Sequence, residues 1–428
     1  MKFKRFVRPF FVLPIGLVAA SASAFAEIVP LAPVDGAEVN LVLPAPREVA
    51  ALPTHDARVA RFKADAAGEK RLLKAEEWRR AADLVLSWRV TDGETGPWKV
   101  LIGKADRFER ESDTYYIRSQ PVNAATGREE QGEATGAVVT CTIPRANLEV
   151  GETYRWQVVM RGNCGKFGCG PHHPCGLYTN VIRSSVATFR TSSAAPRWIA
   201  LEGRVGNVRV LGGWRTLDGR RVRQGLAYRG QGLNDNSVSG EAPGENRLTV
   251  EDRRYLVERL GIRTDLDLRG PDELAGLSAS PIGPSVRLVH NPSESYRDIF
   301  TEKGRAAMAR NFRLFCDQTN YPIYFHCIGG ADRTGALAYV LNAILGVSQH
   351  DLEVDWESTF YPTPPDVWPE YTGPDYWCNL CHLDNGFAQY GGPKTPIRAK
   401  VEKYLAHCGI TSGEIAAFRR IMLTEETN

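Results

Sequence analysis

Residues 321–346 read YPIYFHCIGGADRTGALAYVLNAILG, and this stretch decides the fold of the second half of the chain. Residues 323–325 are an apolar run typical of a buried strand, and from Gly335 onward apolar side chains recur at helical spacing. The loop between them, 327–333, holds a thiol, two adjacent glycines and a guanidinium. Strands and helices alternate from residue 196 onward, which predicts an α/β domain over 196–428.

The loop suits a tetrahedral oxyanion such as phosphate. Consecutive N–H groups of a glycine-rich turn can point inward, and the following helix presents its positive end. Arg333 can donate two parallel hydrogen bonds to phosphate oxygens. The backbone groups that would bind the remaining oxygens belong to Ile328, Gly329, Gly330 and Ala331.

Two further side chains of the loop suit bond cleavage. The positive field favours the thiolate form of Cys327, which is the nucleophilic form of a cysteine. Asp332 is placed to protonate the leaving oxygen. Glu294 and Asp298, in the loop 291–298, are competing acids. Because Asp332 lies directly beside the phosphate ligand, we favour it as the proton donor.

Residues 326–335, HCIGGADRTG, resemble the HCxxGxDRTG signature of a bacterial branch of tyrosine, dual-specificity and phosphoinositide phosphatases, within the cysteine-dependent protein tyrosine phosphatase superfamily. The resemblance implies that Cys327 is the nucleophile, Arg333 the phosphate ligand and Asp332 the general acid. It also implies that the Thr334 hydroxyl eases loss of the thiolate and that His326 orients the loop. No metal or organic cofactor is implied, because the loop supplies the electrostatic stabilisation.

Other interpretations of the cysteine loop are an inert core thiol and a rhodanese-like sulfurtransferase. The loop of that second class usually lacks both the five-residue spacing and the terminal Arg-Thr-Gly. The full ten-residue string between a strand and a helix therefore favours a phosphatase.

Three further segments resemble the same branch. Residues 207–230 are similar to its entry pattern NxRDLGG…DGRxVRxGxLYRS, except that Val210 stands where the family usually has Asp. Residues 267–269 match its DLR motif, which braces the active-site wall or forms a strand-end ion pair. Ala331 replaces the Lys that is frequent in phosphoinositide-acting relatives, so a phosphotyrosine-type aryl ester is favoured over an inositol lipid. Tyr296 and Arg297 are candidates for shaping substrate access.

Residues 1–26 predict a signal peptide, and hence export to the periplasm or the extracellular space. A basic start carrying four Lys or Arg precedes an apolar run over 10–20 and a small-x-small cleavage site at 24–26. Removing those four charges lowers the formal net charge from +3 to −1. A nearly neutral protein gives no argument for nucleic acid, and we expect no stable membrane insertion.

The nine cysteines are typical of an oxidising compartment. If Cys327 stays free, the other eight allow up to four disulfides, with a cluster at 164–175 that Cys141 could join. His172 and His173 raise a zinc interpretation of that cluster, although a disulfide-bridged loop is favoured. Residues 378–382, CNLCH, formally match a haem-attachment motif, and a disulfide or a redox-labile pair is favoured there too.

Residues 27–195 predict an all-β sandwich that resembles a fibronectin type III or other immunoglobulin-like domain. The strands expected are 84–90, 98–102, 114–118, 137–143, 153–160 and 186–190. Residues 57–82 predict a helical insertion with a solvated charged face. This module is interpreted as a scaffold or as a surface-binding domain.

The sequence therefore predicts an exported two-domain phosphomonoesterase acting on phosphotyrosine-type, or dual-specificity, phosphate esters. Three alternatives stay open. They are a phosphoinositide or inositol-phosphate phosphatase, a catalytically weak phosphate-binding or adhesion protein, and a thiol-redox or haem protein.

Overall fold

The computed structural model describes residues 27–41, 44–67, 83–90, 98–111, 113–117, 137–143, 146–161, 181–192, 196–235, 244–359 and 379–425. The predicted signal peptide, the cysteine cluster 164–175 and Cys378 lie outside these residues.

The N-terminal half contains two sheets. The first has the strand order β1–β3–β6, formed by β1 (Ile28–Ala32), β3 (Leu84–Val90) and β6 (Ala137–Ile143). The second has the order β2–β9–β7–β4–β5, with β8 beside β7, formed by β2 (Ala37–Val39), β4 (Trp98–Lys104), β5 (Asp113–Ile117), β7 (Thr153–Arg161), β8 (Val181–Arg183) and β9 (Ala187–Thr191). A short helix, α4 (Phe108–Glu111), follows β4.

One apolar cluster joins the two sheets. Alternate residues of β3 are buried, so that Trp88 enters the cluster and meets Trp98 of β4 edge-on at 5.8 Å between ring centroids. Trp156 of β7 lies in the same cluster and is fully buried. All six predicted strand segments are strands in the structure. The assignment of this half to the immunoglobulin-like class stays a prediction.

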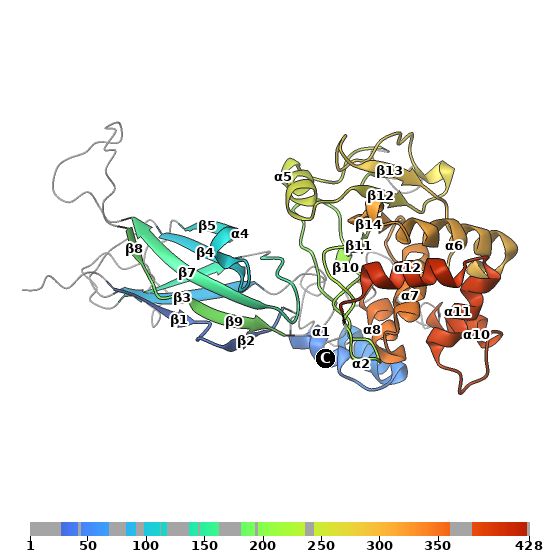
Figure 1. The fold of residues 1–428 in the computed structure, drawn as a ribbon, viewed down its shortest axis with the longest axis horizontal. Helices are drawn as coiled ribbons and strands as arrows, with labels where there is room; N and C mark the ends of the chain where they lie inside the picture. The colour runs from blue at the N-terminus through green and yellow to red at the C-terminus, as the bar shows by residue number, and fades with distance from the viewer. Residues whose placement is uncertain are drawn as a thin grey trace, which may run out of the picture.

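Two helices between β2 and β3 pack against the C-terminal half. They are α1 (Pro44–Ala50) and α2 (His55–Ala67), which lie beside α8 in Figure 1. Arg58 is 1% exposed and its Nε lies 2.6 Å from Glu357 Oε2. The prediction of a solvated charged face was therefore wrong for Arg58, because its partner lies 299 residues away and no local pattern reveals it.

The C-terminal half is built on a five-stranded sheet of order β10–β11–β14–β12–β13. All neighbours are parallel except β10, which is antiparallel to β11. The strands are β10 (Arg209–Val210), β11 (Ala227–Gly230), β12 (Thr264–Asp267), β13 (Arg287–His290) and β14 (Ile323–His326). The predicted catalytic strand, β14, is central and buried at every position, as expected for a strand covered on both faces.

Helices cover this sheet (Figure 1). They are α5 (Val250–Arg254) continued by the π-helical turn Tyr255–Arg259, α6 (Glu302–Phe315), α7 (Asp332–Leu345), α8 (Gln349–Ser358), α10 (Asn379–Ala388), α11 (Ile397–His407) and α12 (Ser412–Met422). The mixture of sheet and helices confirms the predicted α/β class of this half. Cys381 and His382 of the CNLCH motif lie on α10.

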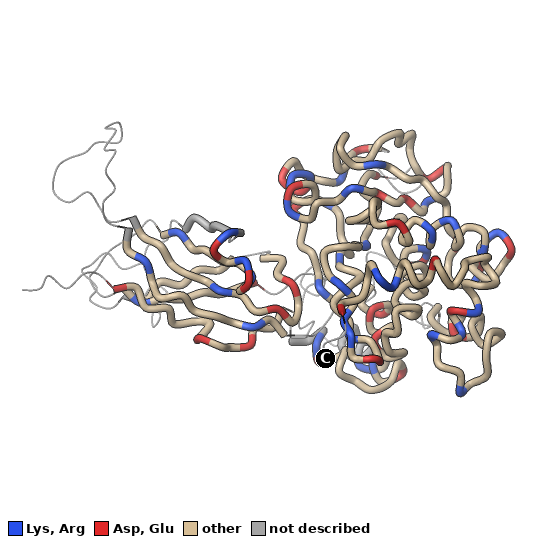
Figure 2. Tube along the Cα trace, viewed as in Figure 1, with Lys and Arg blue, Asp and Glu red and all other residues tan. Residues whose placement is uncertain are grey.

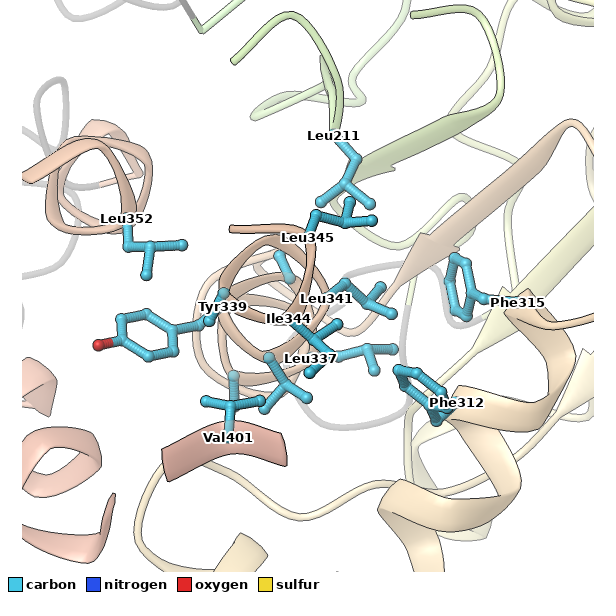
Figure 3. Packing of buried hydrophobic residues seen from close by; sticks show 14 of the residues in the cluster. Leu211, Phe312, Phe315, Leu337, Tyr339, Leu341, Ile344, Leu345, Leu352 and Val401 are labelled. Atoms are coloured by element: carbon cyan, nitrogen blue, oxygen red, sulfur yellow. The ribbon is translucent and has the colours of Figure 1, made fainter. Parts of the chain in front are cut away.

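Helix α7 is the centre of the core. Twelve of its fourteen residues are buried, so it is apolar on all sides rather than on one face. Figure 3 shows its side chains packed among residues of the surrounding elements, with Leu337, Leu341 and Leu345 of α7 near Phe312, Phe315 and Leu211. This packing fixes the helix N-terminus that follows the cysteine loop.

Along the described residues, charges of both signs are interspersed. In Figure 2, Lys and Arg alternate with Asp and Glu along the described parts of both halves. Among the described residues, no helix is both long enough and apolar enough to cross a membrane.

Candidate active site

Cys327 lies directly after β14, where the parallel strands of the sheet end, and is 3% exposed. The carboxyl edge of a parallel sheet is where α/β proteins bind ligands. Gly330 crosses the end of β11 with φ +67°, and a Cβ there would come within 2.4 Å of the Gly230 carbonyl oxygen. Only glycine therefore allows the loop to follow this path.

The loop carbonyls point away from the loop interior. Ile328 O accepts from the Gly232 N–H at 3.0 Å, and Gly329 O accepts from Asn207 Nδ2 at 3.1 Å. Gly330 O accepts from Arg229 Nη2 at 2.9 Å. In a trans peptide the N–H is directed opposite to the C=O, so the N–H groups of residues 329–331 point to the other side. Such an arrangement of N–H groups is typical of anion-binding concavities.

Arg333 is in the first turn of α7 and is held by a carboxylate. Its Nη1 and Nη2 donate to Glu273 at 2.5 and 2.9 Å. Burial opposes its charge, but the hydrogen bonds that it donates to Glu273 and the charge of Cys327 raise the pKa of Arg333 above its usual value. A guanidinium has five donors, so Nε and one N–H on each Nη are left for a phosphate.

Asp332 begins α7 and has an unpartnered oxygen. Its Oδ1 is buried without a hydrogen-bond partner. Burial raises the pKa of Asp332 to about 6, although the charge of Arg333 acts in the opposite direction. A carboxyl group that keeps its proton up to about pH 6, with one oxygen free of hydrogen bonds, is suited to donate that proton to a leaving oxygen.

His326 is fully buried beneath the loop. Its Nε2 lies 3.0 Å from Asp265 Oδ1, and its Nδ1 lies 3.2 Å from Cys327 O. Burial favours the neutral ring, but the charges of Asp267 and Asp265 outweigh it and raise the pKa of His326. A protonated imidazole at this position adds positive charge close to Cys327.

The DLR motif is a buried ion pair at the end of β12. Arg269 Nη2 donates to Asp267 at 2.6 Å and to Asn234 Oδ1 at 2.7 Å. Asp267 also lies 3.9 Å from His326 Nδ1. The motif is thus a strand-end ion pair that also contacts His326, the residue before Cys327.

Thr334 and Val210 are both fully buried. The Oγ1 of Thr334 has no hydrogen-bond partner. Val210 packs in an apolar cluster. This position therefore does not make the polar contact that the Asp of the family pattern could make.

The competing acids are placed differently from Asp332. Glu294 Oε1 forms an ion pair with Lys303 at 2.6 Å. Asp298 is exposed and begins a 3-10 turn, Asp298–Phe300.

Tyr296 forms an aromatic wall with two other rings. Its ring stacks on His382 at 5.8 Å and meets Trp356 edge-on at 6.3 Å. Arg297 Nη2 lies 2.8 Å from His382 Nε2. Burial and then the charge of Asp332 raise the pKa of Tyr296.

The cysteines only partly follow the predicted pairing. Cys141, Cys316 and Cys408 are free thiols, so Cys141 does not join a disulfide cluster. These three free thiols reduce the maximum from four disulfides to two. Cys381 is disulfide-bonded, which leaves no thiol there for a haem thioether. Within the described ranges no group of three or more His, Cys, Asp or Glu is arranged to hold a metal ion.

Residues 199–367 match the model of the tyrosine phosphatase family. The chain contains a tyrosine phosphatase family domain. The match covers the cysteine loop, both of its flanking elements and the segments with Asn207, Arg229 and Glu273.

One relative is a Cupriavidus necator protein named as a tyrosine-protein phosphatase. It is 28% identical over 189 residues, which are 37% of this chain and 64% of the relative. The chain thus spans slightly less than two thirds of the relative's length.

Two solved structures are also similar. The core catalytic domain of the PP-IP phosphatase SIW14 from S. cerevisiae, in complex with citrate, is 17% identical, with a TM-score of 0.23, over 37% of this chain and 88% of that one. A Siw14 catalytic core is 14% identical, with a TM-score of 0.23, over 38% of this chain and 92% of that one.

Proposed function

We propose that the protein is a phosphomonoesterase that hydrolyses phosphotyrosine-type esters through a phosphocysteine intermediate. The observation that carries the proposal is the convergence of three groups on one loop. A buried thiol, a protonatable carboxyl with an unpartnered oxygen and a guanidinium with unused donors all belong to residues 327–333.

In the first step, the phosphate is held by the N–H groups of 329–331 and by Arg333. Cys327 Sγ attacks phosphorus in line with the leaving oxygen, so an S–P bond forms as the P–O bond to the substrate breaks. Asp332 gives its proton to that oxygen, which leaves as a neutral alcohol or phenol. The N–H groups and Arg333 stabilise the charge on the equatorial oxygens.

In the second step, water attacks phosphorus and the S–P bond breaks. Asp332, now a carboxylate, accepts a proton from this water, and Cys327 leaves as a thiolate. The buried hydroxyl of Thr334, which has no partner in the free protein, is available to donate to the departing sulfur. Inorganic phosphate then dissociates.

The substrate class is proposed from the aromatic wall and from Ala331. Tyr296 stacks on His382 and meets Trp356 edge-on, and the Trp356 ring would lie 2.8 Å from a Cβ at Gly335, on the same helix as Asp332. An aryl leaving group can pack against these rings. Ala331 is an apolar, mostly buried residue in the loop. Ala331 therefore offers no positive charge that could bind the additional phosphates of a multiply phosphorylated substrate.

Export and partner binding are part of the proposal. Residues 1–26 support secretion to the periplasm or beyond, and the N-terminal β half is proposed to hold the enzyme at a surface partner. Fractionation of cells expressing the whole chain tests the export. Recovery of the uncleaved protein only in the cytoplasm would contradict it.

The test of the activity is hydrolysis of an aryl phosphate by reduced protein without added metal. Cys327→Ser is expected to abolish turnover, and Asp332→Asn to slow alkyl esters more than activated aryl esters. Phosphotyrosine peptide, phosphoserine peptide and inositol phosphates are compared at equal concentration, and preferential hydrolysis of an inositol phosphate would contradict the substrate class. If reduced wild-type protein binds phosphate but releases none from any ester, the enzymatic proposal falls.

A further inference from the structure

A fully buried charge cluster lies beneath the phosphate loop. Arg209 Nε donates to Asp355 Oδ1 at 2.9 Å, and Arg229 Nη1 donates to Asp355 Oδ2 at 2.7 Å. All three residues are at most 5% exposed. Two guanidinium groups share one carboxylate, so this trio carries a net charge of +1.

The cluster reaches the loop through two hydrogen bonds to successive carbonyls. Arg229 Nη2 donates directly to Gly330 O at 2.9 Å. Arg209 Nη1 donates to Asn207 Oδ1, and Asn207 Nδ2 in turn donates to Gly329 O at 3.1 Å. These two bonds turn the carbonyls outward and, with them, the following N–H groups inward.

The positive charge around Arg229 is not fully balanced by negative charge. Burial, and then repulsion from Arg209, lower the pKa of Arg229 to about 9, while Asp355 and the charge of Cys327 act in the opposite direction. At neutral pH the group is still protonated. An anion in the loop would therefore lower the energy of the cluster, and the cluster would stabilise that anion.

The approach of α7 to this cluster depends on Gly335. A Cβ at Gly335 would lie 2.8 Å from the Trp356 ring and 3.4 Å from Arg229 Nη2. The first turn of α7, with Asp332 and Arg333, therefore packs directly over Arg229.

We propose that Arg229 and Arg209, bridged by Asp355, are positioning residues that hold the phosphate loop in its anion-binding shape and supply positive charge behind the thiolate and the bound phosphate. The inference rests on the proposed phosphatase function and deepens it. The alternative is a purely structural buried ion pair, which would affect folding but not the anion affinity of the folded loop.

The test compares two substitutions that separate charge from hydrogen bonding. Arg229→Gln removes the charge and keeps an amide donor toward Gly330 O, whereas Arg229→Lys keeps the charge. Arg419→Gln is the control, because Arg419 donates to Ile344 O near the opposite end of α7, about 20 Å from the loop. Each variant is first checked for wild-type circular dichroism and a cooperative thermal transition.

Two readouts need no turnover. The first is the pH profile of alkylation of Cys327 by iodoacetamide, followed by mass spectrometry of its peptide because Cys141, Cys316 and Cys408 are also free. The second is the binding of inorganic phosphate, measured as protection of Cys327 from alkylation. kcat and KM for an aryl phosphate are measured alongside.

For Arg229→Gln we expect the half-maximal alkylation pH to rise by about one unit and phosphate binding to weaken about tenfold. Arg229→Lys should keep the wild-type alkylation profile and lower kcat, and Arg419→Gln should change none of these. If Arg229→Gln does not fold, Arg209→Gln is expected to shift the profile in the same direction.

A folded Arg229→Gln or Arg209→Gln with the wild-type profile and wild-type phosphate binding would overturn the inference. The inference would also be overturned if Arg229→Lys, which keeps the charge, shifted the pH profile of Cys327 alkylation as Arg229→Gln is expected to do. Absence of turnover in wild type, with these shifts present, would instead refute the proposed function and leave the anion-binding role of the cluster intact.

Discussion

Replacing Asp332 by Asn should make the protein more stable and less active. The buried carboxylate is costly to ionise, and its Oδ1 has no hydrogen-bond partner to offset that cost. An amide of nearly the same shape removes the ionisation and also the transferable proton. Stability and activity are therefore expected to change in opposite directions, as is common for groups in active sites.

The magnitude follows from the pKa of Asp332, which rises from 3.8 to about 6 on folding. A shift of about 2.2 units corresponds to about 3 kcal/mol. Because the folded-state pKa is raised, folding carries no penalty below pH 3.8, a growing penalty between 3.8 and 6, and the full penalty above about 6. Asp332→Asn should thus equal wild type near pH 4 and be about 3 kcal/mol more stable at pH 7.

The assay is urea unfolding of both proteins at several values from pH 4 to pH 7 in phosphate-free buffer. The difference between the two proteins isolates Asp332 from the other titrating groups. Asp298→Asn is the control, because it makes the same chemical change at an exposed position. A variant that is less stable than wild type at pH 7, or a difference that does not change with pH, would refute the reasoning.

The same pKa sets the activity profile. The acid works only when protonated, so wild-type kcat/KM for an alkyl phosphate should fall about tenfold per pH unit above about 6. Asp332→Asn should lack that decline.

Three other substitutions test neighbouring parts of the structure. Arg58→Met leaves Glu357 buried without its guanidinium, so the free energy of unfolding should fall by about 3–5 kcal/mol in urea unfolding, and an unchanged midpoint would contradict the contact. Glu273→Gln frees the guanidinium of Arg333 from its carboxylate, so KM for an aryl phosphate should rise about tenfold in steady-state assays. Tyr296→Leu should lower kcat/KM for aryl relative to alkyl phosphate by about 2–10-fold, the equivalent of one aromatic pair.

The Arg58 and Tyr296 substitutions each have a matched control. The control for Arg58→Met is Arg61→Met, on the same helix. Arg61 lies 3.8 Å from Glu48, and both side chains are partly exposed. Arg61→Met should therefore change the free energy of unfolding by less than about 1 kcal/mol. Tyr296→Phe keeps the ring and should retain the aryl preference. If Tyr296→Phe lost the preference for aryl over alkyl phosphate, that preference would depend on the Tyr296 hydroxyl and not on its ring.

The parts of the site that are contiguous in sequence could be predicted. Cys327, Asp332 and Arg333 lie within seven residues, and local rules for a strand, a glycine-rich turn and a helix place them together. The sequence predicts the helix from Gly335 onward, and in the structure it begins three residues earlier, at Asp332. The loop's inward N–H groups follow from the same local geometry.

The groups that hold the loop could not be predicted, because they are distant in sequence. Asp355 meets Arg209 across 146 residues, and Glu273 meets Arg333 across 60. In the sequence these are ordinary charged residues, and only the packed fold shows that they are buried partners. Arg58 was misread for the same reason, since a helix rich in charge usually faces solvent.

The central claim is that Cys327 carries the phosphoryl group, and trapping that intermediate tests it most directly. Reduced enzyme is mixed with an aryl phosphate, quenched in denaturant within milliseconds and analysed by peptide mass spectrometry. We expect a phosphate on the peptide containing Cys327, formed in a burst with the phenol and absent from Cys327→Ser. Turnover without a phosphorylated Cys327 peptide, or turnover retained in Cys327→Ser, would contradict it.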